Sequence, residues 1–276
     1  GSISRYLGAD DSHFRGVKLE HYGHSPLTLE NNVFSDITFE SFYGVNIEKI
    51  GSNAFRKTAN NITTFNCRDC FLQHQSPKYD FRTIFSEINQ LYALDLGLNV
   101  TEIPTGTFGT SRNKANLNQI HIKSKGLTIK SGAFQNLKNL QQIRLYYTEI
   151  SKIEKEAFKF INTNNLLTID VYACPLTNQS FQNGSFDGML RSLINFDSVK
   201  ISNLPEEAFK SFLENGNSIH LSNGFYGLIN CEDCKNYWLI EQKKDDQVYN
   251  VHCYHHVRKT LFDEETKSKL SQKCKS

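Results

Sequence analysis

The sequence predicts an α/β solenoid, in which short parallel strands stack side by side and each strand is followed by a return segment. Three observations lead to this prediction. A strand core of the form apolar-x-apolar recurs seven times, a small residue followed by Phe ends six segments, and successive strand cores start 23 to 29 residues apart. A single unit of this length is too small to bury its own apolar face, so the units must stack to form one core.

The stretch from Leu137 to Phe158 shows the unit most completely. Ile143 and Leu145 form the strand core, a turn follows, and Ile150 and Ile153 belong to a returning apolar segment. The strand cores are Phe65/Cys67, Leu94/Leu96, Ile120/Ile122, Ile143/Leu145, Ile169/Val171, Ile194/Phe196 and Ile219/Leu221. The segments with a small residue and Phe end at Phe55, Phe108, Phe134, Phe158, Phe186 and Phe209.

The pattern is that of the leucine-rich repeat. Leu91, Leu94, Leu96 and Asn99 match L-x-x-L-x-L-x-x-N-x-L, whose period is about 20–29 residues. We therefore expect a horseshoe with a parallel β-sheet on its concave face. The ninth position normally turns an Asn or Cys inward after the strand, and we expect irregular turns because this position varies. It holds Cys70, Asn99, Lys125, Thr148, Cys174 and Val199.

Two parts of the chain are predicted. Residues 3–222 form an array of about eight or nine irregular repeats, and residues 223–276 form a cysteine-containing cap. We expect an early strand over 14–19, a helical turn over 80–88, and a short helix over 209–216 that ends at Gly216. No cysteine precedes Cys67, so either an N-terminal disulfide cap lies outside this sequence or residues 5–13 cover the first strand.

The cap contains the sole Trp and four cysteines, Cys231, Cys234, Cys253 and Cys274. A solenoid end exposes its core, so disulfides that close this end are the favoured interpretation. The alternative is a zinc site, because Cys231 and Cys234 have Cys-x-x-Cys spacing and three histidines lie near Cys253. The zinc hypothesis is weaker, since no second Cys or His pair has finger spacing. Spacing alone allows several disulfide pairings.

The other three cysteines, Cys67, Cys70 and Cys174, fall on inward positions of the repeat. Cys70 and Cys174 are four strands apart, which is ~19 Å at ~4.8 Å per strand. A disulfide requires Cα atoms within ~7 Å, so these two residues do not pair. We expect free, buried thiols, although a bridge between Cys67 and Cys70 is also open.

Four Asn-x-Ser/Thr sequences are potential glycosylation sites. Asn61, Asn178 and Asn183 are the predicted sites, whereas Asn99 takes an inward slot of the repeat and is expected to stay unmodified. Together with the cysteine cap, these sites favour an oxidising, extracellular compartment.

Outward residues on the strands line the predicted concave face, and they identify the candidate binding residues. Tyr and Arg are common anchors of protein interfaces. The alternative is that these side chains only stabilise the sheet through cross-strand pairs, Arg144 with Asp170 in particular. The predicted binding residues are Tyr92, His121, Arg144, Tyr146, Tyr147, Asp170 and Tyr172.

The segment Leu204–Leu221 and the stretch from Phe39 through Phe55 resemble secreted arthropod leucine-rich repeat proteins, the family of the non-catalytic subunit of Oplophorus luciferase. The resemblance spans about residues 14–274. It implies a secreted, non-enzymatic scaffold, and one met in arthropods as an allergen. The caps of secreted leucine-rich repeat proteins imply the pairing Cys231–Cys253 and Cys234–Cys274. The sequence departs from the family in having Cys-x-x-Cys where Cys-x-Cys is usual.

Composition excludes several other functions. The 276 residues carry a net charge of +2, which gives no case for nucleic acid as the main partner. No run of ~18 apolar residues indicates membrane insertion. Phosphate loops and hydrolase motifs are absent, so no enzyme, cofactor or metal is expected. We therefore expect an extracellular protein that binds a protein partner. The alternatives are a glycan or microbial pattern-recognition module and a non-catalytic subunit of a secreted enzyme complex.

Overall fold

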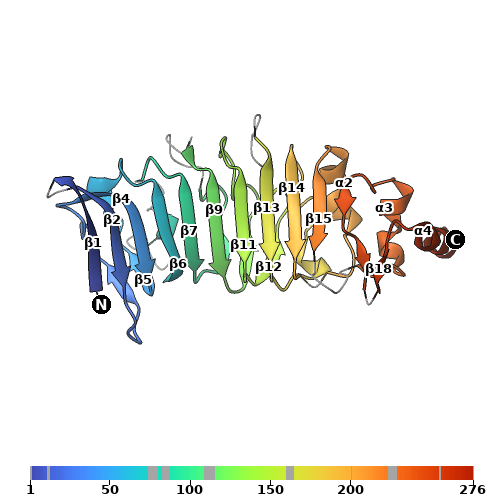
Figure 1. Cartoon of the computed structure of the whole chain (residues 1–276), viewed down its shortest axis with the longest axis horizontal. Helices are drawn as coiled ribbons and strands as arrows, with labels where there is room; N and C mark the ends of the chain where they lie inside the picture. The colour runs from blue at the N-terminus through green and yellow to red at the C-terminus, as the bar shows by residue number, and fades with distance from the viewer. Residues whose placement is uncertain are drawn as a thin grey trace.

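The chain forms one elongated stack of strands. The computed structural model describes residues 2–10, 13–73, 80–82, 88–108, 116–159, 165–199, 201–222, 229–254 and 256–275. Figure 1 shows the strands side by side along the long axis, with the two termini at opposite ends. The main sheet contains, in spatial order, β1 (Ser2–Asp10), β2 (His13–Glu20), β4 (Thr38–Val45), β6 (Thr64–Leu72), β7 (Ala93–Leu98), β9 (Gln119–Ser124), β11 (Gln142–Tyr146), β13 (Leu167–Tyr172), β14 (Ser192–Asp197), β15 (Ser218–Ser222) and β16 (Val248–Tyr249).

The pairing confirms the predicted parallel sheet. Every neighbouring pair from β2 to β16 is parallel. Register follows the repeat, since Ile143 lies level with Ile120 on one side and Ile169 on the other. At the N-terminal end, β1 pairs antiparallel with β2, so a hairpin covers the first parallel strand. The described residues among 5–13 lie in this hairpin, as one of the two alternatives drawn from the sequence expects.

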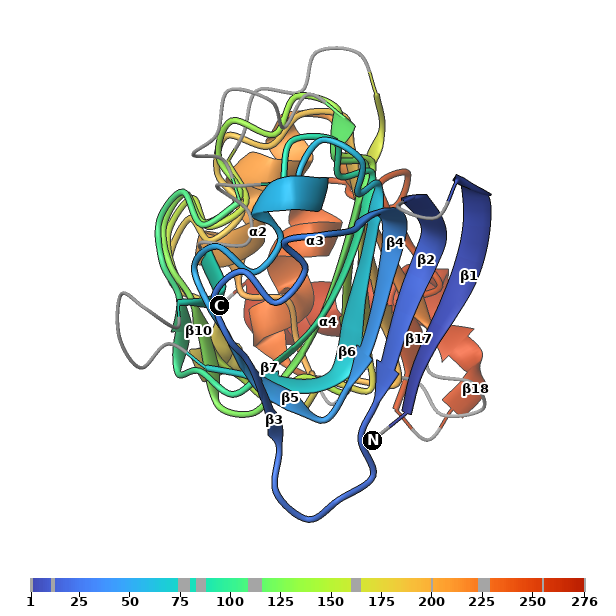
Figure 2. The ribbon, with the colours of Figure 1, turned by 90° about the vertical axis from the view of Figure 1, so that its left-hand side faces the viewer.

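The return segments form the opposite side of the stack. They contain β3 (Leu27–Leu29), β5 (Ile47–Ile50), β8 (Glu102–Ile103), β10 (Leu127–Ile129) and β12 (Ile150–Ile153), together with the short helical turns η1 (Arg56–Thr58) and η4 (Asn178–Ser180) and the helix α2 (Glu206–Glu214). β8, β10 and β12 pair in parallel, as do β3 and β5. Figure 2 looks along the stack and shows β3, β5 and β10 on the side away from the main sheet.

A spine of phenylalanines runs through the core between these two sides. Phe108, Phe134, Phe158, Phe186 and Phe209 stack in sequence, with ring centroids 5.1, 5.3, 5.6 and 4.9 Å apart. All five rings are buried. They are the phenylalanines that end the predicted segments, so the recurring small-residue-Phe pair marks one core position in successive repeats. The small residue packs where a larger side chain would not fit.

The turn before this pair requires a left-handed backbone. Gly106, Gly132 and Gly184 have φ of 67°, 63° and 72° directly before the small residue. In the repeat between those of Gly132 and Gly184, the same place is taken by Glu156, with φ of 56°. Glycine adopts this conformation without steric cost, whereas Glu156 does not.

The prediction that the residue in the ninth position of the repeat points inward is wrong at two of the six positions. Thr148 and Cys174 are buried, and each donates a hydrogen bond to a backbone carbonyl of the preceding repeat. Asn99 and Lys125, by contrast, are exposed, and the residues before them, Leu98 and Ser124, point inward.

Strand length explains the two errors. β7 and β9 continue their alternation through Leu98 and Ser124, so the next residue faces outward. After β11 and β13, Tyr147 and Ala173 adopt positive φ of 52° and 50°. That turn brings the following residue inside. Asn99 is therefore not buried, and the reason for expecting it to stay unmodified is wrong.

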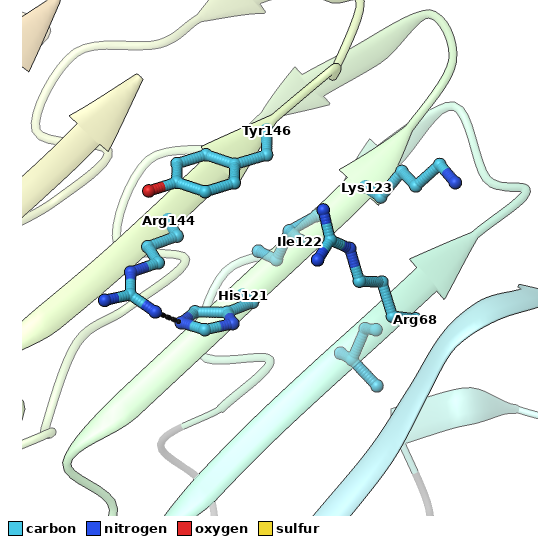
Figure 3. A pocket seen from close by; sticks show the side chains of 7 residues that line it. Arg68, His121, Ile122, Lys123, Arg144 and Tyr146 are labelled. Carbon is cyan, nitrogen blue, oxygen red and sulfur yellow. Dashed lines mark hydrogen bonds between the residues drawn. The ribbon is translucent and has the colours of Figure 1, made fainter. Parts of the chain in front are cut away.

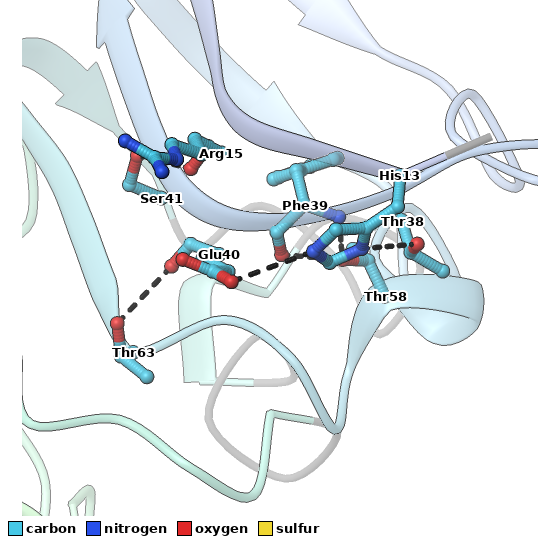
Figure 4. Close-up of polar contacts among 8 residues, drawn as sticks. All are labelled: His13, Arg15, Thr38, Phe39, Glu40, Ser41, Thr58 and Thr63. Atoms are coloured by element: carbon cyan, nitrogen blue, oxygen red, sulfur yellow. Dashed lines mark hydrogen bonds and ion pairs between the residues drawn. The ribbon is translucent and has the colours of Figure 1, made fainter. Parts of the chain in front are cut away.

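Polar contacts join the first repeats at the N-terminal end (Figure 4). The Thr58 hydroxyl bonds to both the amide and the carbonyl of Phe39, at 2.7 and 2.8 Å. His13 lies 2.8 Å from the Thr38 hydroxyl and 3.4 Å from the Glu40 carboxylate. The Thr63 hydroxyl donates to the carbonyl of Glu40. The return segment is thereby tied to the strand it follows.

The C-terminal cap is disulfide-bonded, as predicted. It consists of η5 (Cys234–Asn236), α3 (Tyr237–Glu241), β17 (His252–Cys253), β18 (His256–Thr260) and α4 (Glu264–Cys274), and it also supplies β16. Cys231 bonds to Cys253, and Cys234 bonds to Cys274, which is the pairing implied by the resemblance. The four sulfurs are therefore not available as zinc ligands. Trp238 is buried, and its Nε1 donates to the carbonyl of Leu204 at 2.9 Å, which fixes the cap on the last repeat.

The remaining cysteines divide into two groups. Cys67 and Cys70 form a disulfide, so the expectation of free thiols there is wrong. The register between β6 and β7 shifts between Cys67 and Leu72, and this bulge brings the two sulfurs together. Cys174 is free and buried, as predicted. The helix predicted over 209–216 is present as α2, which begins earlier, at Glu206, and ends at Glu214; Gly216 follows it with φ of 76°. Most of the predicted helical turn at 80–88 lies outside the described residues.

Candidate binding site on the main sheet

A row of polar side chains crosses the outer face of the main sheet. One residue from each strand lies level with the next, because the strands are parallel and in register. The row, called the central row below, contains Lys18, Tyr43, Asn66, Asp95, His121, Arg144, Asp170, Asn195 and His220. It begins with the Lys18 ammonium 5.2 Å from the centre of the Tyr43 ring.

His121 has a defined tautomer in this row. Its Nε2 lies 2.9 Å from Nη1 of Arg144, and its Nδ1 contacts the carboxylate of Asp95. A guanidinium only donates hydrogen bonds, so Nε2 of His121 accepts and carries no proton. The proton therefore resides on Nδ1 and is donated to Asp95. The pair Asp95 and His121 thus orients one side of the Arg144 guanidinium.

Asp170 is the acceptor on the other side of Arg144. Its carboxylate accepts hydrogen bonds from the side-chain amides of Gln142 at 2.8 Å and Asn195 at 2.7 Å. Nε of Arg144 is 3.7 Å from the same carboxylate, which is beyond hydrogen-bond distance, and this buried atom has no hydrogen-bond partner among the described residues. The predicted alternative of an Arg144–Asp170 pair is present as an ion pair without a hydrogen bond from Nε, while Asp170 accepts its hydrogen bonds from the two amides.

Three tyrosines form an aromatic cluster beside the central row. The ring of Tyr172 lies 5.5 Å from Tyr146 and 5.4 Å from Tyr147, and His121 stacks on Tyr146 at 6.5 Å. A hydrogen bond with Tyr147 raises the pKa of the Tyr172 hydroxyl above its usual value. Tyr147 is 56% exposed, since its positive φ turns it away from the sheet. The three rings therefore form one connected aromatic surface at the carboxyl ends of β11 and β13.

A small pocket lies between the aromatic cluster and β6 (Figure 3). Arg68, Leu96, His121, Ile122, Lys123, Arg144 and Tyr146 line it. Three of these side chains are cationic, and the lining contains no carboxylate. The pocket therefore concentrates positive charge on a chain of nearly neutral total charge.

Six of the seven predicted binding residues lie together around this pocket and cluster. Tyr92 does not, because it precedes β7 and lies toward the opposite end of the strands, where its carbonyl accepts from the amides of Asn118 and Gln119. Gln142 was missed, although it stands two residues before Arg144 and alternation places it on the same face. Arg68 and Lys123 face outward as alternation predicts, but sequence gave no reason to select them.

The predicted glycosylation sites differ in exposure. Asn183 is exposed, whereas Asn61 and Asn178 are half-buried. The side-chain amide of Asn178, the atom that a glycan would occupy, donates to Oδ1 of Asn203. Asn183 therefore has the most accessible amide of the three.

The described part of the chain gives no sign of two other kinds of site. It contains no group of three or more His, Cys, Asp or Glu side chains placed to hold a metal ion. None of its helices combines the length and the apolar character that a bilayer crossing needs.

Comparison with known proteins agrees with the architecture. Residues 21–113 and 110–225 match the model of the BspA-type leucine-rich repeat region, in six copies. Asporin from Bos taurus is 29% identical over 100 residues, which is 36% of this chain and 25% of asporin. Decorin from Coturnix japonica and from Gallus gallus is 33% identical over 99 residues, 34% of this chain and 27% of decorin. The chain thus spans about a quarter of the length of these relatives. Since the repeat model covers well over half of the sequence, the chain belongs to the BspA-type leucine-rich repeat family.

Proposed function

We propose that this chain is an extracellular, non-catalytic binding protein that engages a protein partner through the outer face of its main sheet. The observation that carries the proposal is the aromatic cluster of Tyr146, Tyr147 and Tyr172 beside Arg144. Tyr and Arg dominate the energetics of protein interfaces, because they bury large areas with little loss of side-chain freedom. The rigid parallel sheet supports them in advance of binding, which lowers the entropic cost.

Three observations favour a binder over an enzyme. The described pocket has no carboxylate, and no Ser, Thr or Cys lines it. His121 accepts from Arg144 and donates to Asp95, so both its nitrogens are engaged in orienting a cation. The free thiol of Cys174 is buried, and desolvation raises its pKa to about 11, which suppresses the nucleophilic thiolate.

The extracellular location rests on the disulfides. Six of the seven cysteines are in three disulfides, and such bonds persist in oxidising compartments. We propose in addition that Asn183 carries a glycan, since its side chain is exposed. A closer relation to the secreted arthropod family, and with it allergenicity, rests on residues 204–221 and stays a prediction.

The experiment that tests the proposal compares partner capture by the wild type and by a double variant, Tyr146→Ala/Tyr172→Ala. The bait is the immobilised protein and the sample is extracellular fluid of the source organism. Tyr22→Ala is the matched control, because Tyr22 is 79% exposed near the N-terminal end, away from the cluster. The proposal expects a partner that binds the wild type and the control and is lost from the double variant. Equal capture by all three proteins would contradict it.

The alternative function is glycan recognition, in which the tyrosines stack on sugar rings. The same rings serve either ligand, so the captured material distinguishes the two. If digestion of protein in the sample leaves capture by the wild type intact, and removal of glycans abolishes it, the alternative is correct. A third possibility, a non-catalytic subunit of an enzyme complex, is indicated if the captured partner itself has enzymatic activity.

A further inference from the structure

We propose that the pocket between β6 and β11 binds a single carboxylate, supplied by an Asp or Glu side chain of the protein partner, through the guanidinium groups of Arg68 and Arg144. This inference rests on the proposed function and specifies the chemistry by which the main sheet recognises its partner.

Arg144 retains unused hydrogen-bonding capacity. A guanidinium has five N–H donors. One of them reaches His121, while Nε, which is shielded from water, has no hydrogen-bond partner among the described residues. The nearest carboxylate, Asp170, is 3.7 Å away and already accepts from two amides. Because Nε is shielded from water, an incoming carboxylate would bond to the Nη N–H groups that His121 does not use, on a side chain that is 34% exposed.

Arg68 supplies the second guanidinium. Alternation along β6 places Arg68 on the outer face, between the two cysteines of the Cys67–Cys70 disulfide, and Figure 3 shows its side chain extending from β6 toward Ile122 and Tyr146. The backbone of this segment packs closely on β7, because a Cβ at Gly97 would collide with the carbonyl oxygens of Arg68 and Cys70. Within the described residues, the Arg68 guanidinium makes no hydrogen bond or ion pair. Arg68 therefore brings to the pocket a cation that has no hydrogen-bond or ion-pair partner in the described part of the chain.

The surroundings favour one carboxylate over a polyanion. Lys123, the third cation, is 3.4 Å from Asp69, an exposed pair of little energetic value. Asp95 and Asp170 flank the pocket on the central row, and Asp197 lies level with Tyr172 one strand further on. A sulfated glycan would bring several negative charges against these carboxylates, whereas one acidic side chain meets only the cations. The tyrosines around the pocket suit the apolar surface of a protein partner.

The first test uses small probes on the intact protein. The tripeptide acetyl-Gly-Glu-Gly-amide is titrated at constant ionic strength, and the Nε–H resonances of the arginines are followed by NMR. The isosteric peptide with Gln in place of Glu is the control. We expect saturable shifts of the Arg68 and Arg144 resonances with the Glu peptide alone. Equal shifts with both peptides would overturn the proposal.

Substitutions test the two arginines separately. Arg68→Gln and Arg144→Gln should each lower the affinity for the Glu peptide by about tenfold, as expected for loss of one charge-assisted hydrogen-bonded contact. Arg56→Gln removes the same charge from the exposed turn η1 on another part of the molecule and should change nothing. Arg68 is exposed, so its variant is expected to fold even if Arg144→Gln does not. An effect of Arg56→Gln equal to that of Arg68→Gln would contradict a localised site.

A heparin hexasaccharide serves as the probe for an acidic glycan. If it binds more tightly than the Glu peptide and requires Arg144, the occupant is a glycan and the proposal is wrong. Partner capture separates this inference from the proposed function. Capture that survives Arg68→Gln/Arg144→Gln but not Tyr146→Ala/Tyr172→Ala overturns the carboxylate site alone. Capture that survives the tyrosine substitutions overturns the proposed function itself.

Discussion

Phe158 occupies the middle of the phenylalanine spine, and its replacement by Ala should strongly destabilise the array. The ring is fully buried, and it stacks on Phe134 at 5.3 Å and on Phe186 at 5.6 Å. Truncation of a buried Phe costs ~3–5 kcal/mol, through lost burial and the cavity left behind. Each stacked aromatic pair adds ~0.5–1.5 kcal/mol. Because two pairs are lost, we expect a loss near the upper end of this range, about 4–5 kcal/mol.

Two variants separate the contributions. Phe158→Leu keeps most of the buried volume but not the ring, so we expect it to cost about 1–2 kcal/mol. Phe71 is 52% exposed, and Phe71→Ala should change the free energy of unfolding by less than about 0.5 kcal/mol. The assay is urea denaturation followed by circular dichroism under non-reducing conditions. A loss below about 2 kcal/mol for Phe158→Ala, or equal losses for Phe158→Ala and Phe158→Leu, would refute the reasoning.

Three further predictions follow from buried polar groups and from backbone strain. Native protein should resist alkylation up to about pH 10, because burial raises the pKa of the Cys174 thiol to about 11, and protein unfolded without reductant should be modified at Cys174 alone. Since the folded pKa lies above the unfolded value, this thiol contributes stability below about pH 8.5, and that contribution is lost as the pH rises toward 11. Modification of the native protein at pH 8 would contradict both statements. Asn217→Ala should lower the free energy of unfolding, measured by denaturation, by about 3 kcal/mol. The buried Asn217 side chain accepts from the amide of Ser192 and donates to the carbonyls of Met189 and Phe212. A loss under about 1 kcal/mol would mean that water replaces these hydrogen bonds. Glu156→Gly should raise the free energy of unfolding by up to about 1 kcal/mol, since Glu156 has φ of 56° where the neighbouring repeats have Gly. A clear loss of stability would show that the ion pair of Glu156 with Lys159 contributes more than the backbone strain costs.

The strand positions were predictable because the same apolar-x-apolar pattern recurs in successive repeats. Residues such as Ile143 and Leu145 alternate with polar neighbours, and the same alternation recurs in every repeat, so neighbouring copies support each assignment. The Phe at the end of each segment was predictable for the same reason. Its stacking into one spine was not, because the orientation of the rings depends on the packing of the whole core.

Departures from the period limited the prediction of turns. Asn99 was placed inside because the repeat pattern puts an Asn there, yet β7 runs one residue further and turns it outward. The Cys67–Cys70 disulfide depends on a bulge in β6, and no local signal in the sequence separates such a bulge from a regular strand. The bulge belongs to one repeat, so the other copies carry no information about it, whereas the longer strand recurs in β9, where Lys125 faces outward like Asn99.

The candidate site was partly predictable. Alternation placed His121, Arg144 and Asp170 on one face, and register made them neighbours. The occupation of Asp170 by Gln142 and Asn195 was not foreseen, because it depends on side-chain geometry across three strands. Nε of Arg144 stays 3.7 Å from Asp170, beyond hydrogen-bond distance, while Nη1 of Arg144 contacts His121.

The most direct test of the account is photocrosslinking from the outer face of the main sheet. A photoreactive phenylalanine analogue replaces Tyr146 in one variant and Lys152 in another, since Lys152 is exposed on β12, on the opposite side of the stack. Both variants are irradiated in extracellular fluid of the source organism. The account predicts a crosslinked protein partner from position 146 and none from position 152. Crosslinking from position 152 alone would show that the partner binds the return side, and the main-sheet site would be wrong.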